Sequence, residues 1–195
     1  MKSLTGPHFG PVSLEVQAGE VLVLSGPSGV GKSLILRAIA DLDPGDGMVC
    51  MGGMAREQYA PTEWRRLVGL LPSESHWWSN RVGDHFPDDG CRWLDALGLD
   101  PGALSWTVSR LSSGERQRLA LLRMLAIEPR VLLLDEPTAN LDPDTSLSVE
   151  RLVQRYIAER AACAIWVSHH QAQVDRIGSR VLRIGAGGRA QGEAL

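Results

Sequence analysis

The sequence contains no apolar run long enough to span a membrane. A transmembrane helix needs about 20 consecutive, mainly apolar residues, and no stretch of these 195 residues approaches that length. The first ten residues, MKSLTGPHFG, also lack the apolar core of a signal peptide. We therefore expect a cytoplasmic protein, with any membrane in its function supplied by another chain.

Cysteine pairs and excess positive charge are missing as well. Cys50, Cys91 and Cys163 are scattered, without the spacing of a zinc site or of a disulfide framework, which favours reduced thiols that serve packing. The net charge is −3, from 20 basic and 23 acidic residues, so no broad attraction to nucleic acid follows from composition. We expect no nucleic-acid partner.

A glycine-rich octapeptide, GPSGVGKS at residues 26–33, is the most informative stretch. It follows the apolar segment VLVLS and precedes the amphipathic segment LILRAIADL, which is the strand, loop and helix context of a P-loop. Glycines let successive N–H groups turn toward phosphate oxygens at the positive end of the helix. Lys32 is expected to reach the β and γ phosphates and the Ser33 hydroxyl to hold Mg²⁺. The predicted nucleotide-binding residues are Gly26, Pro27, Ser28, Gly29, Val30, Gly31, Lys32, Ser33 and Leu34.

Strand and helix patterns alternate along the chain, which predicts an α/β fold with a mainly parallel sheet. Segment 12–16 (VSLEV) alternates apolar and polar residues and turns into segment 21–25, so we expect an antiparallel pair here. Further strands are expected at 48–51, 67–71, 131–134 and 163–168 and near VLRI at the end, with helices at 61–66 and from Pro143 to about Arg160.

Between residues 73 and 110 the pattern changes. Glycine, proline and tryptophan become frequent, and the clearest helix expected there is 91–99. We predict a small helical subdomain at 73–110, inserted into a nucleotide-binding core formed by 1–72 and 111–195. Ser112, with Glu115 three residues later, is a capping-box pattern that predicts a helix ending before Pro129.

Two carboxylates directly follow the apolar run 131–134. A carboxylate at the carboxyl end of a core strand lies where ligands gather in a doubly wound sheet, so Asp135 is expected to hold Mg²⁺. Glu136 is expected to orient, or take a proton from, the attacking water. Such residues can also end strands for solubility alone, but a P-loop in the same chain favours the catalytic interpretation.

Three further motifs follow the P-loop in order and carry a family resemblance. LSSGERQR at 111–118, VLLLDEPTANLD at 131–142 and WVSHH ending at His170 resemble the ATP-binding subunits of ABC transporters. The resemblance covers nearly the whole chain and implies a single ABC ATPase domain over 1–195, with ATP and Mg²⁺ as its ligands. By matching position it implies the signature residues Ser112, Ser113, Gly114 and Glu115, the D-loop residue Asp142 and the catalytic residues Lys32, Glu136 and His169.

The same resemblance implies partners. In this family two ATP molecules lie between two head-to-tail subunits, and the signature of one subunit contacts the γ phosphate bound to the other. The second subunit is expected to be a copy of this chain or a paralogous ATPase, and the pair to drive a separate integral-membrane permease from the cytosolic face. The compact form and the ending AIWVSHHQAQVDRIGSRVLRI most resemble the small iron or metal export type.

The sequence departs from the family pattern at several positions. Ser73 stands where the family usually has a glutamine that ligates Mg²⁺, which makes it a weaker metal ligand, and Ser113 stands where glycine is usual. His170 replaces a frequent aspartate. An aromatic residue that stacks on adenine normally precedes the P-loop, and here only His8 and Phe9 are available, with packing as the alternative role.

Trp77 and Trp78 follow Ser73 closely. In the family, this region forms the groove that receives a permease. A tryptophan-rich surface suits a protein contact, and filling the small core of the subdomain is the alternative role for the pair.

Two other functions are compatible with parts of the sequence. A soluble ABC ATPase of DNA repair, chromosome organisation or translation carries long coiled coils, zinc modules or two cassettes, which this sequence does not show. A regulatory ATP-binding protein is consistent with Ser73 and Ser113, whereas the intact Lys32, Asp135 and Glu136 favour hydrolysis.

Overall fold

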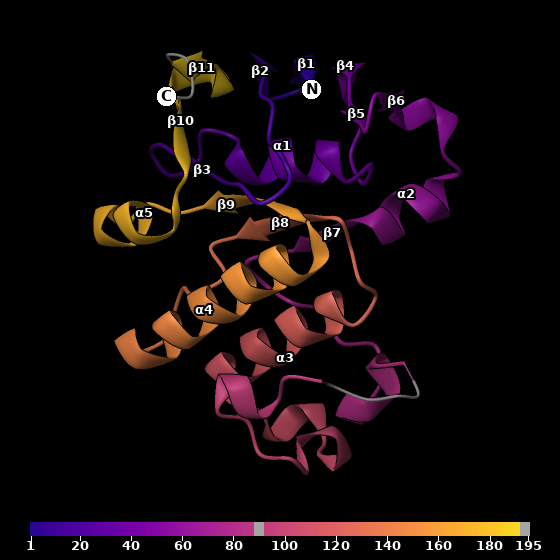
Figure 1. The fold of residues 1–195 in the computed structure, drawn as a ribbon, viewed down its shortest axis with the longest axis vertical. Helices are drawn as coiled ribbons and strands as arrows, with labels where there is room; N and C mark the ends of the chain where they lie inside the picture. Colours follow the sequence, from indigo (N-terminus) through magenta and orange to yellow (C-terminus); the bar gives the residue numbers. More distant parts are fainter. Residues whose placement is uncertain (88–91, 192–195) are drawn as a thin grey trace.

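The computed structural model describes residues 1–87 and 92–191. Its centre is a six-stranded sheet with the order β11-β10-β3-β9-β8-β7 (Figure 1). Five neighbouring strands are parallel and β11 pairs antiparallel with β10 at one edge. The predicted α/β fold with a mainly parallel sheet is confirmed. The strands are β3 (Val21–Ser25), β7 (Val68–Leu71), β8 (Val131–Asp135), β9 (Cys163–Val167), β10 (Arg180–Ile184) and β11 (Ala190–Gln191).

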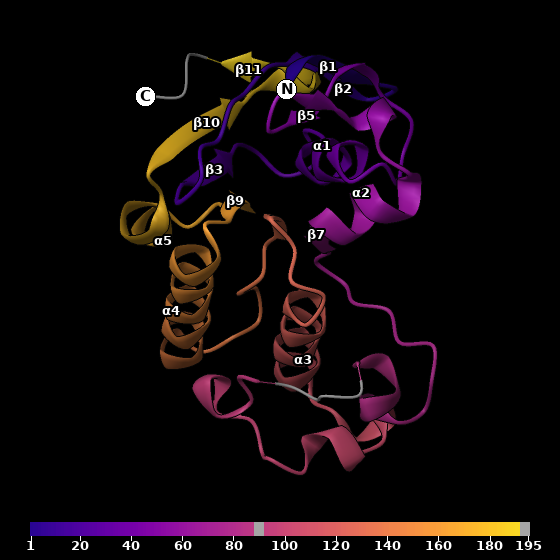
Figure 2. The same ribbon diagram turned by 45° about the vertical axis from the view of Figure 1, so that its right-hand side comes forward.

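Helices cover both faces of this sheet, which is why its central strands are continuously apolar. On β3, Val21 and Val23 belong to one buried cluster with side chains of α3 and α4, while Leu22 and Leu24 belong to a second cluster with α1 and α2. Figure 2 shows these two helix pairs on opposite sides of the sheet. The helices are α1 (Lys32–Ile39), α2 (Pro61–Leu67), α3 (Ser113–Leu125), α4 (Pro143–Arg160) and α5 (Gln171–Ile177).

A smaller antiparallel sheet, with the order β2-β1-β4, packs on α1. The predicted pairing of 12–16 with β3 is wrong: β2 ends at Val12 and pairs with β1, while β3 has β10 and β9 as neighbours. Both edges of β3 are thus occupied by parallel partners. The expected strand 48–51 is interrupted at the buried Val49. The elements here are β1 (Lys2–Gly6), β2 (Phe9–Val12), β4 (Asp46–Met48), β5 (Cys50–Met51), β6 (Met54–Ala55) and the 3₁₀ helix η1 (Arg56–Gln58).

The part of 73–110 that the structure describes consists of short 3₁₀ helices and loops. A helix over 91–99 is not formed: residues 92–94 make a turn, η3 follows, and Gly98 ends it with a φ of +61°. Cys91 lies outside the described residues. So short a segment makes too few helical hydrogen bonds to offset nucleation, and Trp93 and Leu97 are instead buried in the cluster that contains α4. The 3₁₀ helices are η2 (Val82–His85), η3 (Asp95–Leu97), η4 (Ala103–Ser105) and η5 (Val108–Arg110), and η6 (Ala186–Gly188) lies near the carboxyl end.

Helix ends follow the local signals in the sequence. Ser112 caps α3 with the predicted capping box, and α3 ends before Pro129. At the start of α4, the Asp142 carboxylate accepts the N–H of Thr145 at 3.0 Å, with Pro143 as the first helical residue. The two helices that pack side by side on one face of the sheet therefore begin at fixed points.

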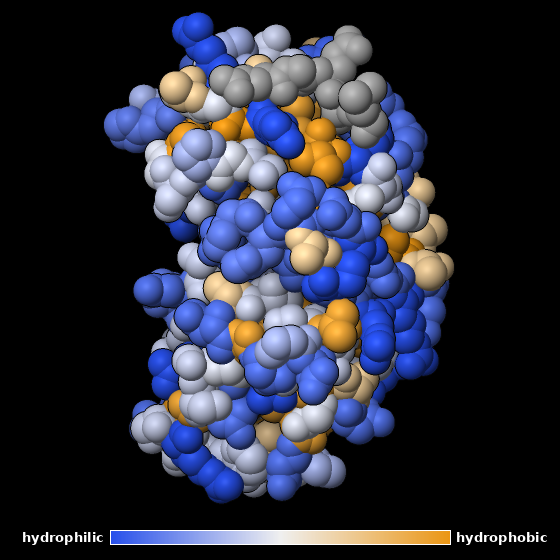
Figure 3. All heavy atoms as spheres, turned by 90° about the vertical axis from the view of Figure 1, so that its left-hand side faces the viewer, coloured by the Kyte–Doolittle hydropathy of each residue, from blue (hydrophilic) through white to orange (hydrophobic). Residues whose placement is uncertain are grey.

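The surface is mainly hydrophilic on the face that carries α5 and β10 (Figure 3). Hydrophobic residues appear there as small separate areas, which is usual for a folded domain. Among the helices of the described residues, none is both long and apolar enough to cross a bilayer.

Tyr156 connects α4 to the loop before β8 through a buried hydrogen bond. Its side chain is fully buried, and its hydroxyl donates to the carbonyl oxygen of Pro129 at 2.8 Å. Its ring packs edge-on against Trp93, with the ring centres 5.8 Å apart. Burial raises the pKa of Tyr156 to about 12. The hydroxyl therefore stays protonated and serves as a structural donor.

Tyr156→Phe keeps the ring and removes this donor. Loss of a partner from a buried carbonyl costs about 1 to 3 kcal/mol, so we expect the free energy of unfolding in urea to fall by that amount. Tyr59→Phe is the matched control, because the Tyr59 hydroxyl makes a longer contact of 3.4 Å to the Met51 carbonyl, and its change should stay within about 0.5 kcal/mol. Equal losses in the two variants would contradict this assignment.

Candidate functional site

The P-loop joins β3 to α1 and depends on its glycines. Gly26, Gly29 and Gly31 have φ angles of +149°, +78° and +98°, a region that L side chains rarely adopt. A Cβ on Gly26 would also lie 2.2 Å from the carbonyl oxygen of Ile184. The loop can therefore keep this path only with glycine at these positions.

Lys32 is the first residue of α1, and its ammonium is folded against the loop. The side chain is 7% exposed, and Nζ donates to the carbonyl oxygens of Gly26 and Pro27 at 2.9 and 2.8 Å. The cation is thus held at the positive end of the helix, where anions bind. Of the other predicted loop residues, Pro27, Ser28 and Ser33 are exposed, and Val30 and Leu34 are half-buried.

Asp135 ends β8, and the structure brings it together with the start of α1. The side chain is buried. Burial, the largest effect, raises the pKa of this carboxyl, and the charge of Glu136 adds to the rise. Hydrogen bonding to the Ser33 side chain lowers the pKa, as do the charge of Lys32 and the backbone of Ser73. A buried carboxylate with such partners favours a nearby positive charge.

The residues around Asp135 fit a magnesium ion. Mg²⁺ is usually bound by one or two carboxylates and completed by phosphate oxygens and water. Asp135 offers the carboxylate and Ser33 a hydroxyl, with Ser73 beside them through its backbone. Within residues 1–87 and 92–191, no group of three or more His, Cys, Asp or Glu forms a complete cage. An ion here would need oxygen ligands from a bound phosphate.

Glu136 and His169 face each other just beyond the strand ends. The Oε1 atom of Glu136 lies 3.3 Å from Nδ1 of His169, and the His169 side chain is 54% exposed. The register of the sheet brings these two residues together, because Asp135 on β8 pairs with Val167 on β9 and Glu136 and His169 follow shortly after these strand ends. Glu136 has a φ of +49°, a left-handed conformation that a residue with a side chain keeps only when its surroundings hold it.

The signature residues lie elsewhere on the molecule. Figures 1 and 2 both show α3 beside the 73–110 segment, across the sheet from α1. The Ser112 hydroxyl accepts the N–H of Glu115 at 3.2 Å and donates to its carboxylate at 2.8 Å. The Ser112 backbone N–H also donates to the Glu115 carboxylate, at 2.9 Å, and this bond, followed by the one from the hydroxyl, lowers the pKa of Glu115. The signature is thus a closed capping box in the single chain, and Ser113 is the first residue of α3.

The predicted D-loop residue adjoins the signature. A Cβ on Gly114 would lie 3.1 Å from the Leu141 side chain, next to Asp142. Hydrogen bonds from Thr145 lower the pKa of Asp142, so this carboxylate is charged at the start of α4. The predicted residues therefore form two groups, one around the P-loop and one at the amino ends of α3 and α4.

A buried polar group near Glu136 and His169 was missed by the sequence reasoning. Glu150 and Gln173 are 3% and 5% exposed and hydrogen bonded to each other at 2.8 Å. The available signal was an acidic residue among the apolar positions of α4, beside Val149, Leu152 and Val153.

Known proteins resemble this chain in sequence. The sequence profile of the family described as ABC transporter matches residues 9–139. The chain is 37% identical over 189 residues to "Protein STAR1" of Oryza sativa subsp. japonica, covering 90% of this chain and 55% of that protein. It is 34% identical over 197 residues to "Phosphate import ATP-binding protein PstB" of Aeropyrum pernix, covering 88% and 78%. It is 31% identical over 177 residues to "Probable iron export ATP-binding protein FetA" of Escherichia coli K12, covering 84% and 79%.

Solved structures resemble it in fold. A bacterial Atm1-family ABC exporter with ATP bound superposes with a TM-score of 0.80 and 25% identity, over 95% of this chain and 35% of that chain. A dimeric ATP-binding cassette in a post-hydrolysis state with ADP and Pi gives a TM-score of 0.83 and 25% identity, over 96% and 90%. The chain spans about half of the rice protein and over three quarters of PstB and FetA. Together with the P-loop and the carboxylates at the strand ends, these matches show that the chain belongs to the ABC transporter family and is an ATP-binding domain of it.

Proposed function

We propose that this chain binds and hydrolyses MgATP within a head-to-tail dimer and thereby drives a separate membrane permease. The observation that carries the proposal is the convergence of Lys32, Ser33 and Asp135 at one edge of the sheet. The pair formed by Glu136 and His169 lies directly beyond it. The relatives' names include phosphate import and iron export, so the proposal concerns the ATP-driven step that such proteins share.

Each residue of the P-loop group has a role in this mechanism. The loop N–H groups and Lys32 bind the β and γ phosphates, and Ser33 and Asp135 hold Mg²⁺, with Ser73 beside them. Bound Mg²⁺ supplies positive charge to the phosphate oxygens. Glu136 orients the attacking water and accepts its proton. His169 holds the Glu136 carboxylate and contacts the γ phosphate.

A second chain is required because the signature is remote from its own P-loop. The amino end of α3 offers the positive end of a helix dipole and free N–H groups to an anion. In a head-to-tail dimer this end, with Ser112, Ser113, Gly114 and Glu115, would meet the γ phosphate bound by the partner. Asp142 would face the partner's P-loop. The partner is a copy of this chain or a paralogous ATPase.

Trp78 is the better placed of the two adjacent tryptophans for contact with a permease. Its side chain is 74% exposed, whereas Trp77 is half-buried and packs against the main core. The buried His85 accepts the backbone N–H of Trp78 at 3.1 Å, and the Arg123 guanidinium lies 5.1 Å from the Trp78 ring. A fixed, exposed indole beside a cation suits a desolvated protein contact. We propose that this surface docks the permease on the cytosolic face of the membrane.

Lys32→Ala tests whether the P-loop binds the triphosphate. Hydrogen bonds to a charged group contribute about 1.5 to 3 kcal/mol, so we expect ATP affinity, measured by titration with a fluorescent ATP analogue, to fall by about 10- to 100-fold. Lys2→Ala is the control, because Lys2 is the other lysine of the chain and is exposed on β1. If both variants bound ATP like the unaltered chain, the loop would not be the phosphate site.

Glu136→Gln tests the shared site. The amide cannot take the proton of the attacking water, so turnover should fall by about 100-fold or more while ATP stays bound and the dimer stays closed. Light scattering with and without MgATP should show a dimer only with the nucleotide. The exposed Glu63→Gln on α2 should leave both properties unchanged. A Glu136→Gln chain that binds ATP and remains a monomer would argue against a dimer that closes unaided.

Trp78→Ala and Trp77→Ala separate docking from packing. We expect the unaltered chain to co-purify with a multi-span membrane protein and Trp78→Ala to reduce this co-purification, with unfolding in urea changed by less than about 0.5 kcal/mol. Trp77→Ala should lower the free energy of unfolding by about 1 to 3 kcal/mol, because it removes packed apolar area. If Trp78→Ala co-purified normally, the docking assignment would be wrong.

A further inference from the structure

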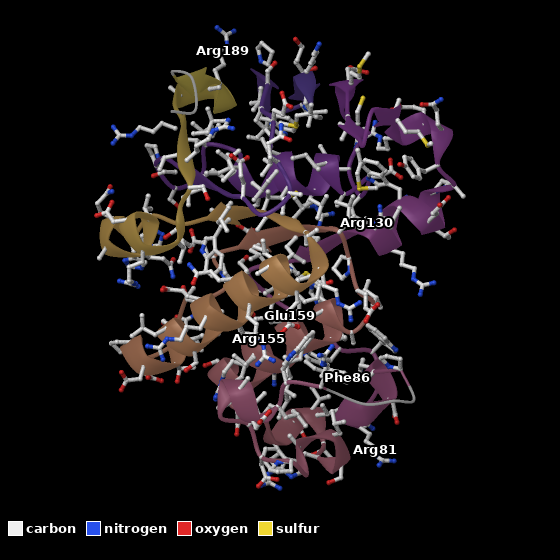
Figure 4. The ribbon with its side chains drawn as sticks, in the orientation of Figure 1. Arg81, Phe86, Arg130, Arg155, Glu159 and Arg189 are labelled. Carbon is white, nitrogen blue, oxygen red and sulfur yellow. The ribbon has the colours of Figure 1, made fainter. Side chains whose placement is uncertain are left out.

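Glu150 is a buried carboxylate with a complete set of donors. It is 3% exposed, and Arg176 on α5 donates to both of its oxygens, from Nε at 3.0 Å and from Nη2 at 2.8 Å. By contrast, the Arg155–Glu159 pair on the outer face of the same helix (Figure 4) is exposed and is of the kind that contributes little to stability. A buried charge is retained only when its partners satisfy it. Glu150 therefore fixes α5 against α4.

Gln173 extends this arrangement to a third segment. Its amide nitrogen donates to Oε1 of Glu150 at 2.8 Å and also to the hydroxyl oxygen of Thr138 at 2.9 Å. The side-chain amide has two N–H donors, and both are thus used inside the protein. One buried amide joins α4, α5 and the segment that follows β8.

The two residues joined by this bond lie close in the sequence to Glu136 and His169. Thr138 is two residues after Glu136, and Gln173 is four residues after His169. The two segments therefore touch twice, once through Glu136 and His169 at 3.3 Å and once through Thr138 and Gln173 at 2.9 Å. Gln173, in the second contact, is 5% exposed, whereas the His169 side chain, in the first, is 54% exposed.

Glu136 needs such support. With a φ of +49° its backbone is in a strained conformation that persists only when neighbouring contacts impose it. His169 is exposed and supplies one of these contacts. The bond from Gln173 to the Thr138 hydroxyl anchors the same segment two residues further along, from a side chain that is 5% exposed.

We propose that Thr138 and Gln173, backed by Glu150, are positioning residues that keep Glu136 and His169 aligned for hydrolysis. This inference rests on the proposed function. A neutral amide suits the position, because it can donate to a hydroxyl and to a carboxylate at once. A carboxylate at 173 would face Glu150 as a second buried negative charge, and an apolar side chain would leave the Thr138 hydroxyl and part of Glu150 without this donor.

Thr138→Val is the most selective test, because it keeps the side-chain shape and removes the hydroxyl. We expect kcat for ATP hydrolysis to fall by about 10- to 100-fold, the size of effect that a small misplacement of reacting groups produces. The affinity for a fluorescent ATP analogue should stay within about twofold, because no P-loop contact changes. Thr138→Ser, which restores the hydroxyl, should recover most of the kcat.

Gln173→Leu should give the same kcat loss with unchanged ATP affinity, and its unfolding in urea is measured beside it. Gln171→Leu is the matched control: Gln171 is the exposed first residue of α5 and pairs with Asp175 on the surface at 2.7 Å. This control should hydrolyse ATP like the unaltered chain.

The outcomes separate this inference from the proposed function. If the unaltered chain hydrolyses ATP and Thr138→Val matches it in kcat and KM, the positioning role is wrong while the function stands. A raised KM with unchanged kcat would also overturn it, as would a Gln173→Leu loss that only follows the fraction of folded protein while Thr138→Val stays fully active. If the unaltered chain binds ATP no better than Lys32→Ala and shows no turnover, the proposed function itself fails.

Discussion

The register between three parallel strands determines where the P-loop, Asp135 and the pair formed by Glu136 and His169 lie. β3 pairs with β9 up to Leu24 and Val167, and β9 pairs with β8 up to Val167 and Asp135. Because these strands end together, the P-loop, the two carboxylates and the histidine segment leave from one edge of the sheet. Apolar clusters on both faces hold the register, since a slip of one residue would turn each strand side chain to the opposite face.

In the proposed dimer, the signature would exchange one set of bonds for another. In the single chain, the Ser112 hydroxyl is already engaged with Glu115 in the capping box, so α3 begins at a stable point before any partner arrives. Such a cap is typically worth about 1 kcal/mol. A phosphate that took this hydroxyl would have to offset that loss, and charge-assisted hydrogen bonds to helix N–H groups are stronger than neutral ones. The signature is therefore a rigid surface that a nucleotide can complete.

Features with a local cause could be predicted from the sequence, and features with a distant cause could not. The strands around Val23, Leu133 and Ile165 are apolar because both faces of the sheet are covered, and Ser112 with Glu115 specifies its own helix start. The pairing expected for 12–16 failed because β10 and β9, more than a hundred residues away, occupy both edges of β3. Gln173 gave no signal, because a polar residue on a short helix is expected to face water. Its burial depends on how α5 packs against α4.

The six tryptophans differ in solvent exposure, so that one of them should dominate the solvent-sensitive fluorescence of the domain. Trp64, Trp93 and Trp166 are buried, Trp77 and Trp106 are half-buried, and Trp78 is 74% exposed. An aqueous quencher such as acrylamide should therefore reach chiefly the Trp78 indole, and water around this ring should place its emission at the longest wavelength of the six. Any molecule that covers Trp78 on the 73–110 segment would shield that fluorophore and shift its emission to the blue. The domain thus carries an intrinsic optical reporter of occupancy on that surface, with no label attached.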